Sequence, residues 1–185
     1  MAQYKLLGIG GVAQCGKDSL YKALYSLEHS FMRYAFADKV KEDLRPALMQ
    51  QYNIDIFKCS PAEKEKCREM LVLYANICRE ENPLHWVQEI EPAVMSSIKS
   101  NIIPVITDVR YENEANWIHE LGGKVIHLKK FFFENGEKKY HPPANEVEAK
   151  NDPLLQNISD LRVEWENNLT PPQMIQFAKN LLTQI

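Results

Sequence analysis

Cysteine is scarce in this sequence of 185 residues, and no apolar run approaches the roughly 20 residues needed to span a bilayer. Cys15, Cys59, Cys67 and Cys78 form no Cys-x-x-Cys pair and no Cys/His spacing typical of a metal site. No signal peptide precedes the first predicted strand. We therefore expect a reduced, cytoplasmic protein that does not interact with a membrane.

An excess of positive charge is also missing. The chain has 22 Lys and Arg against 25 Asp and Glu, a formal net charge of -3. Proteins that bind long nucleic acids non-specifically usually carry a basic surface, so we expect no polymeric nucleic acid as a partner. A small anionic ligand held by a few local cations remains compatible with this balance.

One short segment near the N-terminus combines two of the seven glycines with a lysine. It reads Gly11-x4-Gly16-Lys17, after an apolar run and before a helical pattern. In this strand-loop-helix setting the backbone N–H groups, the helix N-terminus and the lysine can all face a phosphate. We therefore predict a loop that binds a nucleoside triphosphate. Its predicted contacts are Gly11, Ala13, Gln14, Cys15, Gly16, Lys17, Asp18 and Ser19.

The residue after Lys17 is unusual for such a loop. Ser or Thr commonly follows the lysine and helps to hold Mg²⁺, whereas this chain has Asp18 and then Ser19. Asp18 can coordinate Mg²⁺ directly or through water, or hold the acceptor, and Ser19 can take the hydroxyl role if the register shifts by one. Alternatively, Asp18 is only a favourable charge in the first helical turn.

Cys15 lies inside the predicted loop. Inward N–H groups and the nearby Lys17 predict a stabilised thiolate at this position. We therefore expect bound ATP to protect Cys15 against alkylation.

Strand and helix patterns alternate along the chain, which predicts an α/β fold with a mainly parallel sheet of five strands. The expected strands are residues 4–9, 31–37, 102–107, 124–128 and 161–165. The expected helices are residues 16–27, 38–52, 61–79, 84–100 and 113–121, with a last helix after Thr170. The polar segment 131–152 is expected to be an excursion that can close over a site.

The buried strand that ends near Thr107 delivers an acid and a base, Asp108 and Arg110. Ligands bind at the carboxyl edge of open parallel sheets. Asp108 is thus a candidate for positioning Mg²⁺, and Arg110 is a candidate for contacting a phosphate. The alternative is that the two side chains simply pair with each other.

Several of these strings together resemble the deoxynucleoside monophosphate kinases of bacteriophages. The resemblance covers about residues 5–148 and rests on the Gly-Lys-Asp-Ser ending of the loop, Phe36-Ala-Asp-Lys-Val-Lys41, Arg68-Glu-Met-Leu71 with Arg79, Trp86-Val87, and Thr107-Asp-Val-Arg110 with Asn113-Glu-Ala115. It implies a P-loop NTPase fold of the nucleoside monophosphate kinase type, a three-layer sandwich that forms one domain over residues 1–185. Within this domain we expect an acceptor-binding helical part at about 38–100 and a mobile lid at about 129–152.

The resemblance also implies the reaction and the contacts. Such kinases use ATP and Mg²⁺ to convert deoxynucleotides to diphosphates, in the host cytoplasm when the gene is carried by a phage. The implied catalytic residues are Lys17, Asp18 and Arg110, and the implied metal ligands are Asp18, Ser19 and Asp108. The implied acceptor contacts are Asp18, Lys41, Arg68, Arg79, Trp86, Asp108, Arg110 and Glu146. Lys129 and Lys130 of the lid are expected near the triphosphate.

The chain departs from this family in the lid. The usual His-x-Ser-Glu string has as its nearest counterpart His141-Pro-Pro-Ala-Asn-Glu146, with two extra residues and no Ser. Arg68 and Arg79 stand eleven residues apart, about 16 Å along an unbroken helix, so one small phosphate does not easily reach both. They can contact opposite ends of a nucleotide, or the helix can break near Asn76.

Two other classes of protein fit the loop. One is a kinase whose acceptor is a hydroxyl group, of a modified DNA base or a small metabolite, with Asp18 as the base. The other is a nucleotide-binding switch that signals through its loops. The sequence leaves open the base preference and the oligomeric state, a homodimer included.

Overall fold

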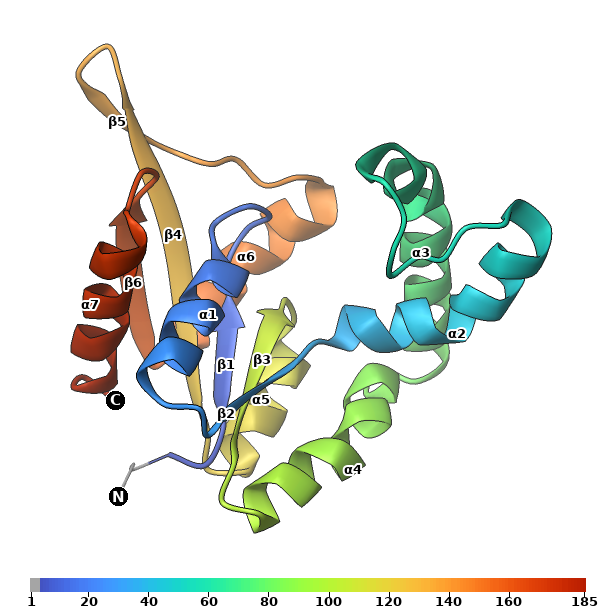
Figure 1. Cartoon of the computed structure of the whole chain (residues 1–185), viewed down its shortest axis with the longest axis horizontal. Coiled ribbons are helices and arrows are strands. Elements are labelled where there is room, and N and C mark those ends of the chain that lie inside the picture. The colour runs from blue at the N-terminus through green and yellow to red at the C-terminus, as the bar shows by residue number, and fades with distance from the viewer. Residues whose placement is uncertain (1–3) are drawn as a thin grey trace. The chain divides into compact units, whose positions relative to one another are not determined.

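The structure is a computed structural model that describes residues 4–185, in which six β-strands and seven α-helices form (Figure 1). The chain divides into two compact units. The first comprises the residues up to Tyr34 together with Ala93–Ile185, and it contains the whole sheet. The second, Ala35–Pro92, is helical.

Five parallel strands form the sheet of the first unit, in the spatial order β2-β3-β1-β4-β6. They are β1 (Leu7–Gly10), β2 (Phe31–Tyr34), β3 (Ile103–Val109), β4 (Lys124–Glu134) and β6 (Leu161–Glu166). The predicted α/β class and mainly parallel sheet are confirmed. Because β1 lies between β3 and β4, the strand order reverses there, and the loop after β1 stands at the switch point where open sheets bind ligands.

Helices cover both faces of this sheet and complete three layers. On one face α1 (Lys17–Leu27) contacts α7 (Pro171–Leu182), and on the other α5 (Glu112–Glu120) contacts α6 (Glu146–Ile158) (Figure 1). The main core lies between the first helix pair and the sheet. Its fully buried side chains include Leu7, Ile9, Leu20, Leu24, Ile126 and Leu128.

The segment expected to be a polar excursion is more regular than predicted. β4 continues to Glu134, turns at Asn135-Gly136 and pairs antiparallel with β5 (Glu137–Tyr140). Asn135 and Gly136 both have positive φ, 53° and 82°, as a two-residue hairpin turn requires. Helix α6 then begins at Glu146, so this segment adds a sixth strand and a helix to the expected elements.

The second unit contains α2 (Phe36–Tyr52), α3 (Pro61–Glu81) and the first part of α4 (His85–Lys99). Helix α2 begins at Phe36, so β2 ends at Tyr34 rather than at the expected residue 37. Ser60 and Glu63 form a capping box that fixes the start of α3. A small cluster of Leu48, Ile56 and Cys67 holds the helices together.

Trp86 is a core residue of this unit. Its side chain is 1% exposed, its indole Nε1 donates to the carbonyl oxygen of Ala75 at 3.1 Å, and its ring meets that of Tyr74 edge-on. The indole thus ties α4 to α3. The expected substrate contact of Trp86 stays a prediction, and in this structure its ring is buried.

Within residues 4–185, no helix has the length and apolar character needed to cross a membrane.

We predict that Trp86→Phe lowers the free energy of unfolding by about 1–2 kcal/mol, because the Ala75 carbonyl loses a buried hydrogen bond. Chemical denaturation measures the change. Tyr74→Phe is the matched control, since it removes the exposed hydrogen bond from the hydroxyl to Asp43 and keeps the ring, and it is expected to cost less. Equal losses in the two variants would contradict the role assigned to the indole.

Candidate functional site

The loop between β1 and α1 has the geometry that its glycines predict. Gly11 and Gly16 have φ values of +124° and +98°, in a region that L side chains rarely adopt. A Cβ on Gly11 would lie 2.2 Å from the Leu128 carbonyl oxygen, and one on Gly16 would lie 2.2 Å from the Trp165 ring. Both positions therefore require glycine.

The loop leads directly into the N-terminus of α1. Gly16 is the N-cap residue, and it has no side chain that caps the helix. The first-turn N–H groups and the positive end of the helix dipole are therefore oriented toward the loop. This arrangement fits an anionic phosphate, which such helix termini bind.

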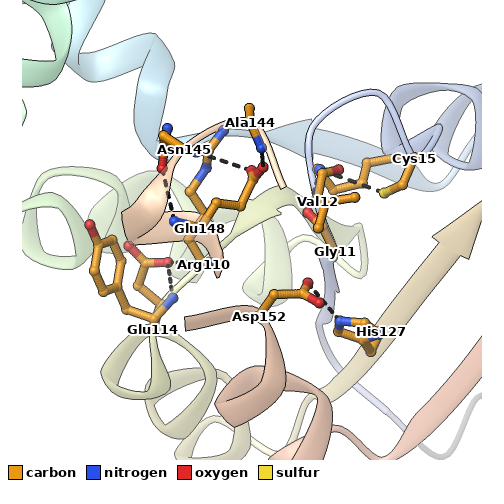
Figure 2. Close-up of polar contacts among 12 residues, drawn as sticks. Gly11, Val12, Cys15, Arg110, Glu114, His127, Ala144, Asn145, Glu148 and Asp152 are labelled. Atoms are coloured by element: carbon orange, nitrogen blue, oxygen red, sulfur yellow. Dashed lines mark hydrogen bonds and ion pairs between the residues drawn. The ribbon is translucent and has the colours of Figure 1, made fainter. Parts of the chain in front are cut away.

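The ammonium group of Lys17 lies over the same loop. Its Nζ donates to the carbonyl oxygens of Gly11 at 2.7 Å and Val12 at 2.8 Å, and it lies 3.7 Å from Cys15 Sγ. Figure 2 shows these three loop residues. A phosphate oxygen is a stronger partner for a cation than a neutral carbonyl, so Lys17 can exchange these bonds for a ligand.

Cys15 does not have the expected stabilised thiolate. Its side chain is fully buried, and burial raises the pKa of the thiol, although the nearby Lys17 partly opposes this effect. Sequence reasoning recognised the lysine but not the burial, and burial has the larger effect. Cys15 contributes to the loop through its backbone.

Trp165 at the end of β6 supports the loop, a role that no motif in the sequence indicated. Its indole Nε1 donates to the carbonyl oxygen of Cys15 at 2.8 Å, and its ring occupies the space beside Gly16. The ring also packs against Phe177 of α7, with 5.3 Å between centroids. The loop is thus supported from a strand 150 residues further along the chain.

Asp18 and Ser19 have different surroundings. The carboxylate of Asp18 is 70% exposed and pairs with Arg33 of β2, with 3.2 Å between Oδ1 and Nε. Ser19 lines a pocket of about 260 Å³ between α1 and α7. Sequence reasoning did not identify Arg33. Its position on the neighbouring strand β2 depends on the sheet order.

Arg110 directly follows β3 and points toward α6. Its guanidinium Nη1 lies 3.5 Å from Oε1 of Glu148, a buried carboxylate that also accepts from the backbone N–H of Ala144 at 2.7 Å (Figure 2). The backbone N–H of Arg110 donates to Glu114 at 2.8 Å. Both the backbone and the side chain of Arg110 are therefore held by carboxylates.

Helix α6 is anchored to strand β4 by a buried polar contact. His127 of β4, which pairs in register with Gly10, is buried, and its Nε2 lies 2.8 Å from Oδ1 of Asp152 (Figure 2). Glu146, the acidic residue that the sequence indicated, is exposed at the start of this helix. Glu148, two residues on, is the residue that contacts Arg110.

Strands β4 and β5 form the hairpin that carries Lys129 and Lys130, the cations expected near the triphosphate. Lys129 Nζ lies 5.7 Å from the centroid of the Tyr140 ring, and Lys130 is half-buried beside it in the sequence. Lys138 pairs with Glu164 of β6 at 2.5 Å, which ties the hairpin to the sheet.

The second unit holds the candidate acceptor residues. Arg68 and Arg79 lie on the single unbroken helix α3, so the break considered near Asn76 does not occur. Arg68 is exposed and pairs with Glu65 at 2.9 Å, and Arg79 donates to the Ala75 carbonyl at 3.4 Å. Lys41 pairs with Asp38 at 2.6 Å.

Within residues 4–185, no group of three or more His, Cys, Asp or Glu side chains converges as a metal site. Mg²⁺ in phosphate-transferring enzymes is usually held by one or two carboxylates, with substrate phosphates and water completing its shell. The single exposed carboxylate of Asp18, directly after the loop, suits that mode of binding. Asp108 lies within β3, next to its last residue.

Comparison with solved structures identifies the fold. A sugar kinase from a Janibacter species aligns with a TM-score of 0.52 and 12% identity over 97% of this chain and 95% of that chain. A dephospho-CoA kinase from Campylobacter jejuni aligns with a TM-score of 0.51 and 16% identity over 99% and 98%. A protein from Thermus thermophilus gives 0.52 and 11% over 99% and 98%.

At these identities the similarity shows the fold alone, an α/β fold that this chain shares with the sugar kinase and the dephospho-CoA kinase. Neither a known protein family nor a curated relative matches the sequence.

We predict that a water-soluble thiol reagent modifies Cys15 far more slowly than the half-buried Cys59 and Cys78. The reason is that the reagent needs the thiolate, and burial disfavours it. The rates are read by mass spectrometry at pH 8, with Cys15→Ser as the control for assignment. Rapid modification of Cys15 in the folded protein would contradict the buried placement.

The same raised pKa has a consequence for stability. The folded state holds the Cys15 proton more tightly than the unfolded state does. The stabilisation of the folded state that comes from this proton is therefore complete at pH values below the ordinary thiol pKa of about 8.5. This stabilisation is lost as the pH rises from the ordinary thiol pKa to the raised pKa of Cys15 in the folded protein. Cys15→Ser should remove this part of the alkaline decline.

Proposed function

We propose that this protein is an ATP-dependent kinase that transfers the γ-phosphoryl group of ATP to a deoxynucleoside 5′-monophosphate, giving a deoxynucleoside diphosphate and ADP. The loop from Gly11 to Lys17 carries the proposal. Two left-handed glycines, an uncapped helix N-terminus and a lysine lie together at the switch point of the sheet. The fold of P-loop kinases and the sequence strings shared with phage kinases support the same function.

In this proposal the loop binds the triphosphate. Backbone N–H groups of residues 13–19 and the Lys17 ammonium neutralise its β and γ phosphates. Asp18 is the first candidate for holding Mg²⁺, with Ser19 and Asp108 as further candidates. The ion would supply additional neutralisation of phosphate charge when it is bound.

The acceptor phosphate needs no strong general base. A nucleoside monophosphate has a second pKa of about 6, so its oxygen already carries the negative charge needed to attack at neutral pH. Positioning and charge neutralisation are then the main tasks of the protein. Arg110, held by Glu148 beside the end of β3, is the cation proposed to contact the transferred phosphoryl group.

Arg68 and Arg79 are the proposed acceptor contacts of the helical unit, with Lys41 as a third. The ion pair of Arg68 with Glu65 is exposed on both sides, and pairs of this kind contribute roughly 0.2–1 kcal/mol. Exchanging Glu65 for a substrate phosphate therefore costs little. Lys129 and Lys130 of the hairpin are proposed to approach the triphosphate when this segment closes.

A second candidate is a kinase with a hydroxyl acceptor. The observation that favours it is the exposed Asp18 carboxylate next to the loop, where it can accept a hydroxyl proton.

A coupled assay of ADP release tests the proposal. ATP and Mg²⁺ are supplied with each of the deoxy- and ribonucleoside monophosphates and, separately, with sugars and other small alcohols. We expect turnover with at least one deoxynucleoside monophosphate and its near-complete loss in Lys17→Ala. Turnover with alcohols alone would support the second candidate, and normal turnover in Lys17→Ala would contradict the role of the loop.

We predict that Arg68→Ala or Arg79→Ala weakens acceptor binding by one to two orders of magnitude, with ATP affinity almost unchanged. The estimate follows from a hydrogen bond to a charged group, worth roughly 1.5–3 kcal/mol. Calorimetric titration with the monophosphate and with ATP separates the two effects. Arg45→Ala is the control, since this arginine of the same unit pairs with Asp55. Normal monophosphate binding in both variants would argue against this acceptor.

Glu148→Gln tests the anchoring of Arg110. The amide can still accept from the Ala144 N–H but no longer attracts the guanidinium, so we expect kcat to fall about tenfold, as for a loss near 1.4 kcal/mol. ATP binding should not change. Lys150→Gln alters an exposed charge of the same helix and should have normal kinetics. Identical kinetics for the two variants would contradict this role of Glu148.

A further inference from the structure

The imidazole of His141 carries a polar atom that the fold leaves without a partner. Its Nε2 is shielded from solvent and forms no hydrogen bond with any of residues 4–185. The ring packs against that of Phe132, with 5.4 Å between centroids. A shielded polar atom without a hydrogen bond costs free energy. Such an atom is stabilised when a bound ligand supplies the missing partner.

His141 extends the β4–β5 hairpin by one residue. Strand β5 ends at Tyr140, which pairs with Phe131. The backbone N–H of His141 then donates to the carbonyl oxygen of Lys130 at 3.3 Å, which continues the same antiparallel register. Pro142 follows, and a residue before proline is biased toward extended backbone. The position of His141 is therefore set by its pairing with β4.

The edge of β4 that bonds His141 also borders the loop between β1 and α1. The Leu128 carbonyl oxygen lies 2.2 Å from the place of a Cβ on Gly11, and the Lys130 carbonyl oxygen accepts from His141. Carbonyls two residues apart on a strand point to the same edge, and two residues span about 7 Å. His141 therefore follows the loop along this edge, at a level about 7 Å beyond Gly11.

The side chain of His141 projects from the face of the sheet that α1 covers. Residues that pair directly across two strands share a face. Lys130 is opposite His141 on one side and pairs with Trp165 of β6 on the other. The Trp165 ring lies beside Gly16, at the start of α1. His141, Lys130 and Trp165 thus form one row on the face that carries the loop and its helix.

The segment that follows His141 crosses the end of β1. It starts beside β4 and leads to α6, whose Glu148 contacts Arg110 directly after β3. Because β1 lies between β4 and β3, the segment passes over the carboxyl end of β1, where the loop begins (Figure 1). An anion bound to the loop is therefore flanked by His141 from the side of β4.

We propose that His141 is a contact for the triphosphate of ATP, with the Nε2–H group donating to a phosphate oxygen beside Lys130. The cation in the same row favours an anionic partner over the nucleoside. The ring is half-buried, and rotation about its side-chain bonds turns Nε2 from Phe132 toward that oxygen. This contact rests on the proposed function, because ATP is taken as the ligand of the loop, but it is independent of the acceptor.

Calorimetric titration with a non-hydrolysable ATP analogue and Mg²⁺, without acceptor, tests the contact. His141→Phe keeps a ring against Phe132 but has no donor, so we expect affinity to fall about tenfold. His141→Gln places an amide N–H near the Nε2 position and should recover most of the affinity. Tyr140→Phe is the matched control with unchanged affinity, because Tyr140 projects from the opposite face, where its hydroxyl donates to Glu164 at 3.0 Å.

The outcomes separate this contact from the proposed function. Equal binding of the analogue by the wild-type protein and His141→Phe, or a loss that His141→Gln does not recover, would overturn the contact and leave the kinase proposal standing. A loss seen only in titrations with a deoxynucleoside monophosphate would assign His141 to the acceptor and overturn the contact as well. A wild-type protein that does not bind the analogue would contradict both proposals.

Discussion

The left-handed turn at Gly16 is the constraint on which the rest of the site depends. It allows the chain to leave the loop and enter α1 within one residue, so that the helix N-terminus faces the loop. The ring of Trp165 fills the space where a Cβ would lie, and its indole N–H holds the Cys15 carbonyl. The loop is thereby fixed by the last strand of the parallel sheet as well as by its own strand.

Helix α6 provides a second anchor, on the opposite face of the sheet from α1. The buried contact of His127 with Asp152 holds this helix against β4, and Glu148 of the same helix holds Arg110. Arg110 is thus connected through α6 to β4, the strand that pairs with β1 before the loop. A phosphoryl group that moves in line needs cations held in place in this way, because positioning and neutralisation of charge are most of the catalysis.

Local patterns predicted most of the fold. The alternation of apolar strand runs with helical patterns predicted the mainly parallel sheet, and the structure confirms it. The glycine spacing predicted the loop after the first strand. The hairpin turn and α6 were missed although the sequence held signals for both. Asn135-Gly136 is a typical hairpin turn, and Asn145 followed by Glu148 is a typical helix start. The polar composition of this segment favoured a loop in the sequence analysis.

Other features could not be read from a single sequence. The support from Trp165 joins residues 150 positions apart, and the pairing of Asp18 with Arg33 depends on the strand order. Burial raises the pKa of Cys15 and encloses the ring of Trp86. Neighbouring residues in the sequence do not determine which side chains become buried. The roles of Arg68 and Arg79 stay predictions that rest on the resemblance to phage kinases.

Phosphorus NMR of the protein mixed with ATP, Mg²⁺ and the four deoxynucleoside monophosphates tests the central claim most directly. The account predicts that the γ-phosphate signal of ATP disappears while the β-phosphate signal of a deoxynucleoside diphosphate grows in equal amount. Release of inorganic phosphate alone, or an unchanged spectrum under all conditions in which the protein stays folded, would contradict it.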